Sequence, residues 1–165
     1  KNKLNDHFIF DGVEVNRFSR FTEIPRSTLG CYLIVKNEEK NIEKCLNNLS
    51  RICDEIVVVD TGSVDETIIK IVGHFEKVRL YSFNWINDFS AARNYAMSLT
   101  KSDYIFTIDA DEELTDELID TINELKYENF KDLRSLGLYL RLGDDNYPYG
   151  GRQIVKNSGY FIVFT

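Results

Sequence analysis

No glycine-rich phosphate-binding loop occurs in this sequence. Neither G-x-G-x-x-G nor G-x-x-x-x-G-K follows the first predicted strand, where the turn reads "KNEE". Both motifs depend on glycine because their backbones approach a phosphate closely. Their absence disfavours a dinucleotide site and a P-loop. Any bound phosphate would therefore have to be held by a metal ion and by side chains.

An excess of basic residues and long apolar runs are also lacking. The net charge of −7 argues against nucleic acid as the main partner, because a phosphate backbone needs a basic surface. A small phosphate compound stays open, since a metal ion supplies positive charge locally. No apolar run reaches transmembrane length, and nothing reads as a signal peptide. We expect a cytoplasmic protein without a transmembrane segment, and we leave open a peripheral contact at the inner membrane surface.

Cysteine and histidine are scarce. Cys31, Cys45 and Cys53 are odd in number and match no metal-binding spacing, which indicates buried thiols in a reducing compartment. His7 and His74 have no suitable partner nearby in the sequence, so we interpret both as structural. No Ser/His/Asp or Cys/His arrangement is apparent.

Strand and helix patterns alternate along most of the chain. Its 165 residues, 43% hydrophobic and 28% charged, suit one ordinary globular domain. Apolar runs predict strands at 31–35, 55–60, 78–83, 104–109 and 135–142, and apolar spacing predicts helices at 42–49, 61–75, 88–99 and after Thr115. This order predicts an α/β, Rossmann-like domain, with a mostly parallel sheet and helices on both faces. Ligands of such sheets bind at the carboxyl ends of the strands.

The helix predicted at 61–75 carries an apparent start signal. Ser63 and Glu66 have the spacing of a capping box. Ile68, Val72 and Phe75 then follow at the spacing of one helix face, so we expect them to point into the core.

Carboxylates end two of the predicted strands. Asp60 ends one strand, and Asp109 ends another and forms D-x-D with Asp111. Because the carboxyl ends of parallel strands share one edge, we expect these carboxylates to converge on one cleft and to offer Mg²⁺ or Mn²⁺ oxygen ligands. An acidic loop in water and a turn organised by Asp60 are the alternatives. Glu112 and Glu113 would face solvent or favour the next helix N-terminus.

The segment "NWINDFSAARN" combines the only tryptophan, Trp85, with charged residues. Asp88 or Ser90 is predicted to cap the helix that follows. Arg93 lies five residues after Asp88 and is followed by Asn94. Arginine suits a phosphate or carboxylate partner because its hydrogen bonds are forked. A surface ion pair is the alternative.

Four stretches in this order, "VKNEEKNIEKCLNNL", "DEIVVVDTGSVDET", "NWINDFSAARN" and "YIFTIDADE", resemble family 2 glycosyltransferases of the GT-A fold. The similarity is strongest to the subgroup that carries W-x-x-D-F-x-x-A-R-N, which includes bacterial lipopolysaccharide-type sugar transferases. Peptide S-glycosyltransferases look similar. The resemblance covers residues 29–125, which divides the chain into an N-terminal extension (1–29) and a GT-A nucleotide-sugar-binding domain (30–165).

The resemblance implies a metal-dependent, inverting hexosyltransferase that uses a nucleotide-sugar donor, with UDP as the expected nucleotide and Mn²⁺ or Mg²⁺ as the cofactor. The implied acceptor is a saccharide (for example a bacterial cell-surface glycan), a lipid-linked glycan or a peptide. The implied donor-site residues are Val35, Asn37, Glu38, Asp60, Asp88, Arg93, Asn94 and Asp109. Among them Asp60 would bond the base and Arg93 would lie near the diphosphate. The implied metal ligands are Asp111 and Asp109.

The chain departs from this family near its end. Relatives continue into a segment with a His-Glu pair and an acceptor-binding half, so we expect the domain to be C-terminally truncated and the catalytic base to lie outside the sequence shown. Asp144 and Asp145 read as a polar turn. A fragment with little activity of its own, and a non-catalytic nucleotide-sugar-binding or scaffold domain, therefore stay open. A nucleotidyltransferase is less favoured, because the first loop lacks glycine.

Overall fold

The computed structural model describes residues 7–10, 13–16, 27–72, 76–127, 130, 135–141 and 148–157. Near the N-terminus, β1 (His7–Phe10) and β2 (Val13–Asn16) pair as the antiparallel strands of a two-stranded sheet. The larger sheet begins at Leu29, and the predicted division of the chain near this residue stays a prediction.

Six strands form the larger sheet, in the order β5-β4-β3-β6-β8-β7. Their bounds are β3 (Leu29–Val35), β4 (Glu55–Asp60), β5 (Val78–Ser82), β6 (Tyr104–Thr107), β7 (Ser135–Arg141) and β8 (Pro148–Lys156). The first four in this order are parallel, whereas β8 runs antiparallel to β6 and β7 runs antiparallel to β8. This confirms the predicted α/β class and mostly parallel sheet, with an antiparallel pair at one edge.

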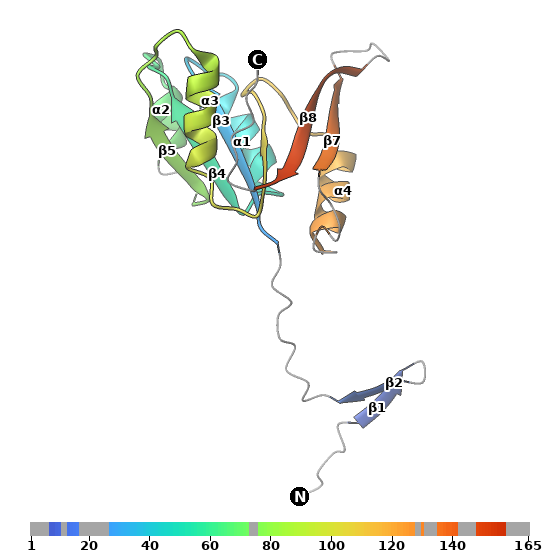
Figure 1. The fold of residues 1–165 in the computed structure, drawn as a ribbon. Helices are drawn as coiled ribbons and strands as arrows, with labels where there is room; N and C mark the ends of the chain where they lie inside the picture. Colours follow the sequence, from blue (N-terminus) through green and yellow to red (C-terminus); the bar gives the residue numbers. More distant parts are fainter. Residues whose placement is uncertain are drawn as a thin grey trace, which may run out of the picture.

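Helices cover both faces of the sheet, as predicted (Figure 1). The helices are α1 (Ile42–Ser50), α2 (Thr67–Ile71), α3 (Phe89–Ser98) and α4 (Asp116–Tyr127). Alternate residues of the strands point to opposite faces, so that Leu33 packs with α1 and α4, and Tyr32 packs with α3. None of the helices in the described ranges has the length and apolarity that a membrane span requires.

The chain reverses its direction of winding between β3 and β6. β3 leads through α1 to β4 on one side, and β5 leads through α3 to β6 on the other side of β3. At such a point the loops that follow neighbouring strands diverge and leave a crevice at the carboxyl edge. The fold therefore places a ligand crevice beside the loops after β3 and β6.

The start of α2 differs from the prediction. The helix begins at Thr67, not near Ser63, and Glu66 at its N-cap makes no side-chain capping hydrogen bond. The predicted inner residues Ile68 and Val72 are 38% and 60% exposed, whereas Thr67 and Ile71 are buried. The capping-box prediction was wrong because the Ser63 hydroxyl accepts a hydrogen bond from another loop, as described below. The third predicted inner residue, residue 75, lies outside the described residues.

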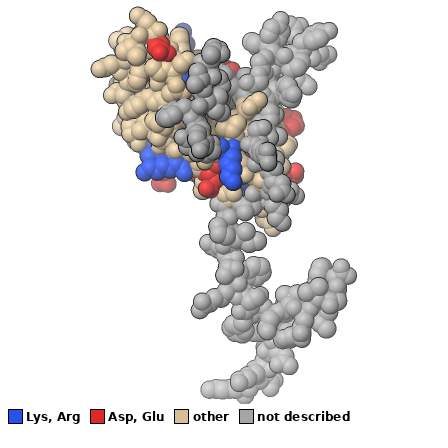
Figure 2. Space-filling view, viewed as in Figure 1, with Lys and Arg blue, Asp and Glu red and all other residues tan. Residues whose placement is uncertain are grey.

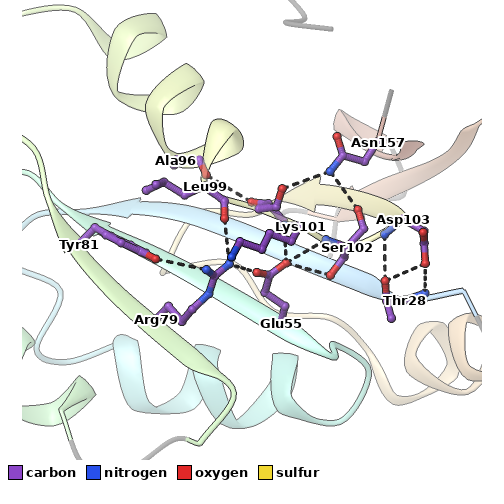
Figure 3. Close-up of polar contacts among 11 residues, drawn as sticks. Thr28, Glu55, Arg79, Tyr81, Ala96, Leu99, Lys101, Ser102, Asp103 and Asn157 are labelled. Carbon is purple, nitrogen blue, oxygen red and sulfur yellow. Dashed lines mark hydrogen bonds and ion pairs between the residues drawn. The ribbon is translucent and has the colours of Figure 1, made fainter. Parts of the chain in front are cut away.

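A polar network holds the opposite, amino-terminal edge of the sheet together (Figure 3). Glu55 at the start of β4 accepts hydrogen bonds from the Lys101 and Ser102 N–H groups, at 2.8 and 3.0 Å, and forms an ion pair with Arg79 of β5. Arg79 also donates to the Leu99 carbonyl at the end of α3, at 2.8 Å. On the face drawn in Figure 2, charged side chains of the described residues gather near the start of β3. This edge is therefore fixed by charge-assisted bonds, away from the crevice.

Candidate donor-binding site

A pocket of about 360 Å³ lies at the carboxyl edge of the sheet. Its lining combines residues at the end of β3 and just after it, after β4, on and before α3, and after β6: Ile34, Val35, Lys36, Glu38, Thr61, Trp85, Phe89, Arg93, Asp109, Ala110 and Asp111. Segments far apart in the sequence therefore meet where the topology predicts a ligand crevice.

The loop after β3 is bonded to the loop after β4 through side-chain acceptors. The backbone N–H groups of three successive residues donate to that loop: Asn37 to Ser63 Oγ (2.9 Å), Glu38 to Thr67 Oγ1 (2.7 Å) and Glu39 to Asp65 Oδ2 (3.1 Å). In return, Val64 N–H donates to Asn37 Oδ1 at 2.9 Å. A loop whose N–H groups are used in this way does not form a backbone cradle for phosphate. This agrees with the absence of a glycine-rich motif.

Asp60 organises the turn after β4. Its side chain accepts hydrogen bonds from the Gly62 N–H at 2.9 Å and the Ser63 N–H at 3.1 Å, and the residue is 5% exposed. Gly62 has a φ of 106°, a conformation that glycine adopts without steric cost. Thr61 lines the pocket, whereas Asp60 is not among the lining residues. The observed contacts of Asp60 are therefore those of the alternative in which it organises the turn.

The acidic loop after β6 divides its carboxylates among different tasks. Glu112 accepts a hydrogen bond from the Asp109 N–H at 2.9 Å and closes the turn, and Glu113 pairs with Lys44 of α1 at 2.6 Å. Asp109 and Asp111 line the pocket, and Asp111 is exposed. The expectation that Glu112 and Glu113 merely face solvent or favour a helix N-terminus was therefore incomplete, because both have specific partners.

A buried asparagine anchors the acidic loop to α1. Asn48 is 9% exposed and bonds both backbone groups of Leu114: its Nδ2 donates to the carbonyl at 3.0 Å, and its Oδ1 accepts from the N–H at 2.9 Å. Leu114 itself is 3% exposed. The loop that carries the two pocket carboxylates is therefore held at its far end by a two-point contact.

Arg93 lies between α3 and the acidic loop. Its Nη2 donates to Asp109 Oδ1 at 3.2 Å, and its Nε is buried without a hydrogen-bond partner among the described residues. The helix that carries Arg93 is capped by Asp88, the first of the two predicted caps, whose side chain accepts a hydrogen bond from the Ala91 N–H at 2.9 Å. The guanidinium therefore offers hydrogen-bond donors to the pocket, and the helix that carries it has a fixed start.

An aromatic pair completes the wall. Trp85 and Phe89 contact each other edge to face, with ring centroids 4.7 Å apart. Trp85 Nε1 donates to Asn87 Oδ1 at 2.9 Å, which fixes the indole in place. Phe89 is 66% exposed although it lines the pocket. In the sequence Trp85 stands out as the only tryptophan but without an indicated role. Phe89 gives no signal, because one apolar residue at a helix start does not differ from a core residue in sequence.

The three cysteines are free and buried, as predicted. Burial raises the pKa of Cys45 to about 12, with further contributions from Cys53 and from the carboxylates of Glu112, Asp109 and Asp111. A thiol with this pKa stays protonated at neutral pH and is a poor nucleophile and metal ligand. The acidic loop therefore projects negative potential onto α1 as well as into the pocket.

The carboxylates suit a divalent cation that brings ligands of its own. Among the described residues, no cluster of three or more His, Cys, Asp or Glu side chains is placed to hold a metal ion. Asp109 and Asp111 supply two hard oxygen donors, and Mg²⁺ is commonly held by one or two carboxylates together with phosphate oxygens. The donor set thus fits a metal–phosphate complex and not a cation enclosed by protein alone.

The predicted site residues divide into two groups. Val35, Glu38, Arg93, Asp109 and Asp111 line the pocket, whereas Asn37, Asp60, Asp88 and Asn94 are not among its lining residues. Asn37, Asp60 and Asp88 hold the loops and the helix that shape it. Asp144, Asp145 and His74 lie outside the described residues.

The sheet order, with a pocket at the carboxyl edge, defines an α/β domain of the GT-A fold, which its structural neighbours share. The sequence model of glycosyl transferase family 2 matches residues 31–159, and the chain belongs to this family.

Relatives named as glycosyltransferases agree with this assignment. Glycosyltransferase SunS of the Bacillus subtilis SPbeta prophage is 43% identical over 84 residues, which are 51% of this chain and 20% of that protein. An uncharacterized glycosyltransferase of Rickettsia bellii is 36% identical over 101 residues, 61% of this chain and 33% of that protein. The chain thus spans between a fifth and a third of the length of these relatives.

Two solved structures share the fold at low identity. Staphylococcus aureus TarS (residues 1–349) aligns with a TM-score of 0.59 and 20% identity, over 74% of this chain and 38% of that one. The mannosyltransferase PcManGT of Pyrobaculum calidifontis, solved with GDP-mannose and Mn²⁺, aligns with a TM-score of 0.58 and 21% identity, over 70% of this chain and 36% of that one.

Proposed function

We propose that this domain forms the donor half of a metal-dependent, inverting glycosyltransferase that takes its sugar from a nucleotide diphosphate, with UDP as the expected nucleotide. The observation that carries the proposal is the convergence of Arg93, Asp109 and Asp111 in one pocket where the sheet reverses its winding. The family assignment supports transfer of a sugar, and the neighbour solved with GDP-mannose and Mn²⁺ is an example of this fold with a metal and a nucleotide sugar.

Asp109 and Asp111 would hold the divalent cation through their carboxylates. When bound, the cation supplies positive charge that stabilises the departing nucleoside diphosphate. Arg93 binds the diphosphate oxygens through its forked donors. Its buried Nε has no hydrogen-bond partner among the described residues, and a phosphate oxygen would satisfy it. The Arg93–Asp109 contact at 3.2 Å orients both groups before the donor arrives.

The loops after β3 and β4 would receive the nucleoside. Val35 and Glu38 form part of the lining, and Asn37 fixes the loop shape through its bonds to Ser63 and Val64. Asp60 would accept a base N–H with the remaining lone pairs of its carboxylate, in addition to its bonds within the turn. Asp88 and Asn94 would shape the α3 wall. A loop that is already ordered costs little entropy when the nucleoside binds.

Transfer with inversion also requires a base that removes the acceptor proton. We assign this role to no residue of the chain. A hexose as the transferred sugar, a saccharide, lipid-linked or peptide acceptor, and a cytoplasmic location with peripheral membrane contact remain parts of the same proposal.

Thermal unfolding with added nucleotide tests the donor site. UDP with Mn²⁺ should raise the stability of the chain by about 2.7 kcal/mol at one hundred times the dissociation constant. UDP without metal should give a much smaller shift. Asp111→Asn should abolish the metal-dependent part, because one oxygen donor loses its charge.

Glu113→Gln is the matched control, since it removes the same charge from the same loop but from a carboxylate that pairs with Lys44. It should retain the full shift. The proposed site would be refuted if UDP stabilised the wild type equally with and without metal. It would also be refuted if UDP with Mn²⁺ stabilised Asp111→Asn as much as the wild type.

A further inference from the structure

The aromatic pair has no role in the site as proposed so far. Trp85 and Phe89 line the same pocket as Thr61 and Lys36, from the loops assigned to the nucleoside. The T-shaped contact between the rings and the Trp85–Asn87 hydrogen bond of 2.9 Å fix the orientation of the pair. Phe89 is nevertheless 66% exposed, so a large apolar ring on a rigid support faces the pocket uncovered.

The order of groups along α3 gives the wall a direction. Phe89 and Arg93 are four residues apart, which places them on one helix face about 6 Å apart along the axis. Arg93 in turn contacts Asp109. The wall therefore runs from the aromatic pair, through the guanidinium, to the carboxylates of the acidic loop.

A nucleoside diphosphate anchored at the acidic end would extend along this wall. With the diphosphate on the charged groups, the nucleoside would reach the aromatic end, beside Lys36, which lines the same pocket. A nucleobase is a flat π system, and it covers an exposed aromatic ring by stacking regardless of which base it is.

We infer that Phe89, supported by Trp85, is the stacking platform for the nucleobase of the donor. The inference rests on the proposed function and assigns the two residues a positioning role in the same site. Stacking supplies affinity and fixes the plane of the base, whereas the choice among bases depends on hydrogen bonds to the edge of the base. Loss of a stacking ring should weaken nucleotide binding about 5- to 150-fold.

The only tryptophan of the chain provides the readout. Fluorescence of Trp85 in the full chain is titrated with Mn²⁺–UDP and with Mn²⁺–pyrophosphate, which lacks the base. We expect both probes to bind the wild type. Only Mn²⁺–UDP, which carries the base, should quench the indole fluorescence strongly. Phe89→Ala should weaken UDP binding by the factor above and leave pyrophosphate binding unchanged, and Phe89→Tyr should restore UDP binding.

Ile86→Ala is the matched control, because Ile86 is 61% exposed on the same segment but does not line the pocket. It should bind both probes as the wild type does. Circular dichroism checks that each variant folds. We expect Phe89→Ala to fold, because Phe89 is largely exposed and its loss leaves no cavity in the core.

Two results would overturn the inference alone: equal weakening of UDP and pyrophosphate in Phe89→Ala, or unchanged UDP binding with weaker binding of a UDP-sugar, which would assign the ring to the sugar. Failure of the wild type to bind UDP with Mn²⁺ would overturn the proposed function, and the inference with it.

Discussion

Replacement of Asn48 by alanine should loosen the acidic loop and destabilise the domain. The change removes two hydrogen bonds of 2.9 and 3.0 Å and leaves the N–H and carbonyl of buried Leu114 without their partner. An unsatisfied buried polar group costs about 1–3 kcal/mol, so two of them predict a loss of about 2–4 kcal/mol after partial access of water. For a chain of this size the melting temperature should fall by roughly 4–16 °C.

Urea unfolding followed by circular dichroism measures this loss, with Asn47→Ala as the control. Asn47 is the exposed neighbour of Asn48 on α1, so the control makes the same chemical change without breaking the Leu114 contact. It should stay within about 0.5 kcal/mol of the wild type. Asn48→Asp should also destabilise, because its oxygen keeps the Leu114 N–H but repels the Leu114 carbonyl.

A functional readout separates anchoring from general stability. At a temperature where Asn48→Ala is still folded, its affinity for Mn²⁺–UDP should fall, because Asp109 and Asp111 lose their fixed position. Equal stability of the Asn48 and Asn47 variants would refute the assigned anchor. Full Mn²⁺–UDP affinity in a destabilised Asn48→Ala would show that the anchor does not position the carboxylates.

Three further predictions concern the core and the amino-terminal edge. Gly30→Ala should lower stability by about 1–3 kcal/mol in urea unfolding, because its Cβ would lie 2.7 Å from Thr100 Cγ2; an unchanged midpoint would contradict the packing. Hydrogen bonds from the Thr28 N–H and hydroxyl lower the pKa of Asp103. Its contribution to stability is therefore complete above about pH 4 and is lost as the pH falls through the lowered pKa. The melting temperatures of the wild type and Asp103→Asn should accordingly converge as the pH falls. A difference in melting temperature that does not change with pH would exclude this linkage. Cys45, with a pKa of about 12, should resist maleimide at pH 8 until the chain unfolds, and early labelling detected by mass spectrometry would disprove its burial.

The strands could be predicted from the sequence because their signal is local. The run at 55–60 is continuous and apolar, and it forms β4 with the predicted bounds. Asp88 as a cap of α3 and Thr115 before α4 were likewise local signals, and both accept the hydrogen bonds expected of caps. The rule for parallel sheets predicted that Asp60, Asp109 and Asp111 share one cleft. Asp109 and Asp111 do line one pocket, whereas Asp60 is not among its lining residues.

The interactions that the sequence could not indicate join distant segments. The Ser63 hydroxyl accepts from Asn37, and Thr67 Oγ1 accepts from Glu38, so tertiary contacts compete with the capping box. The same holds for Glu113 in the acidic loop, whose partner Lys44 lies on α1. Local patterns contain no information on which of several acceptors a distant donor selects.

The bonds between the loops after β3 and β4 have a consequence for protein engineering. Because residues 36–39 and 60–67 satisfy each other's polar groups, neither segment keeps its shape when the other is exchanged alone. A chimera with a related enzyme must transplant both segments together, as one cassette. Directed-evolution libraries aimed at the proposed nucleotide site should accordingly randomise them jointly.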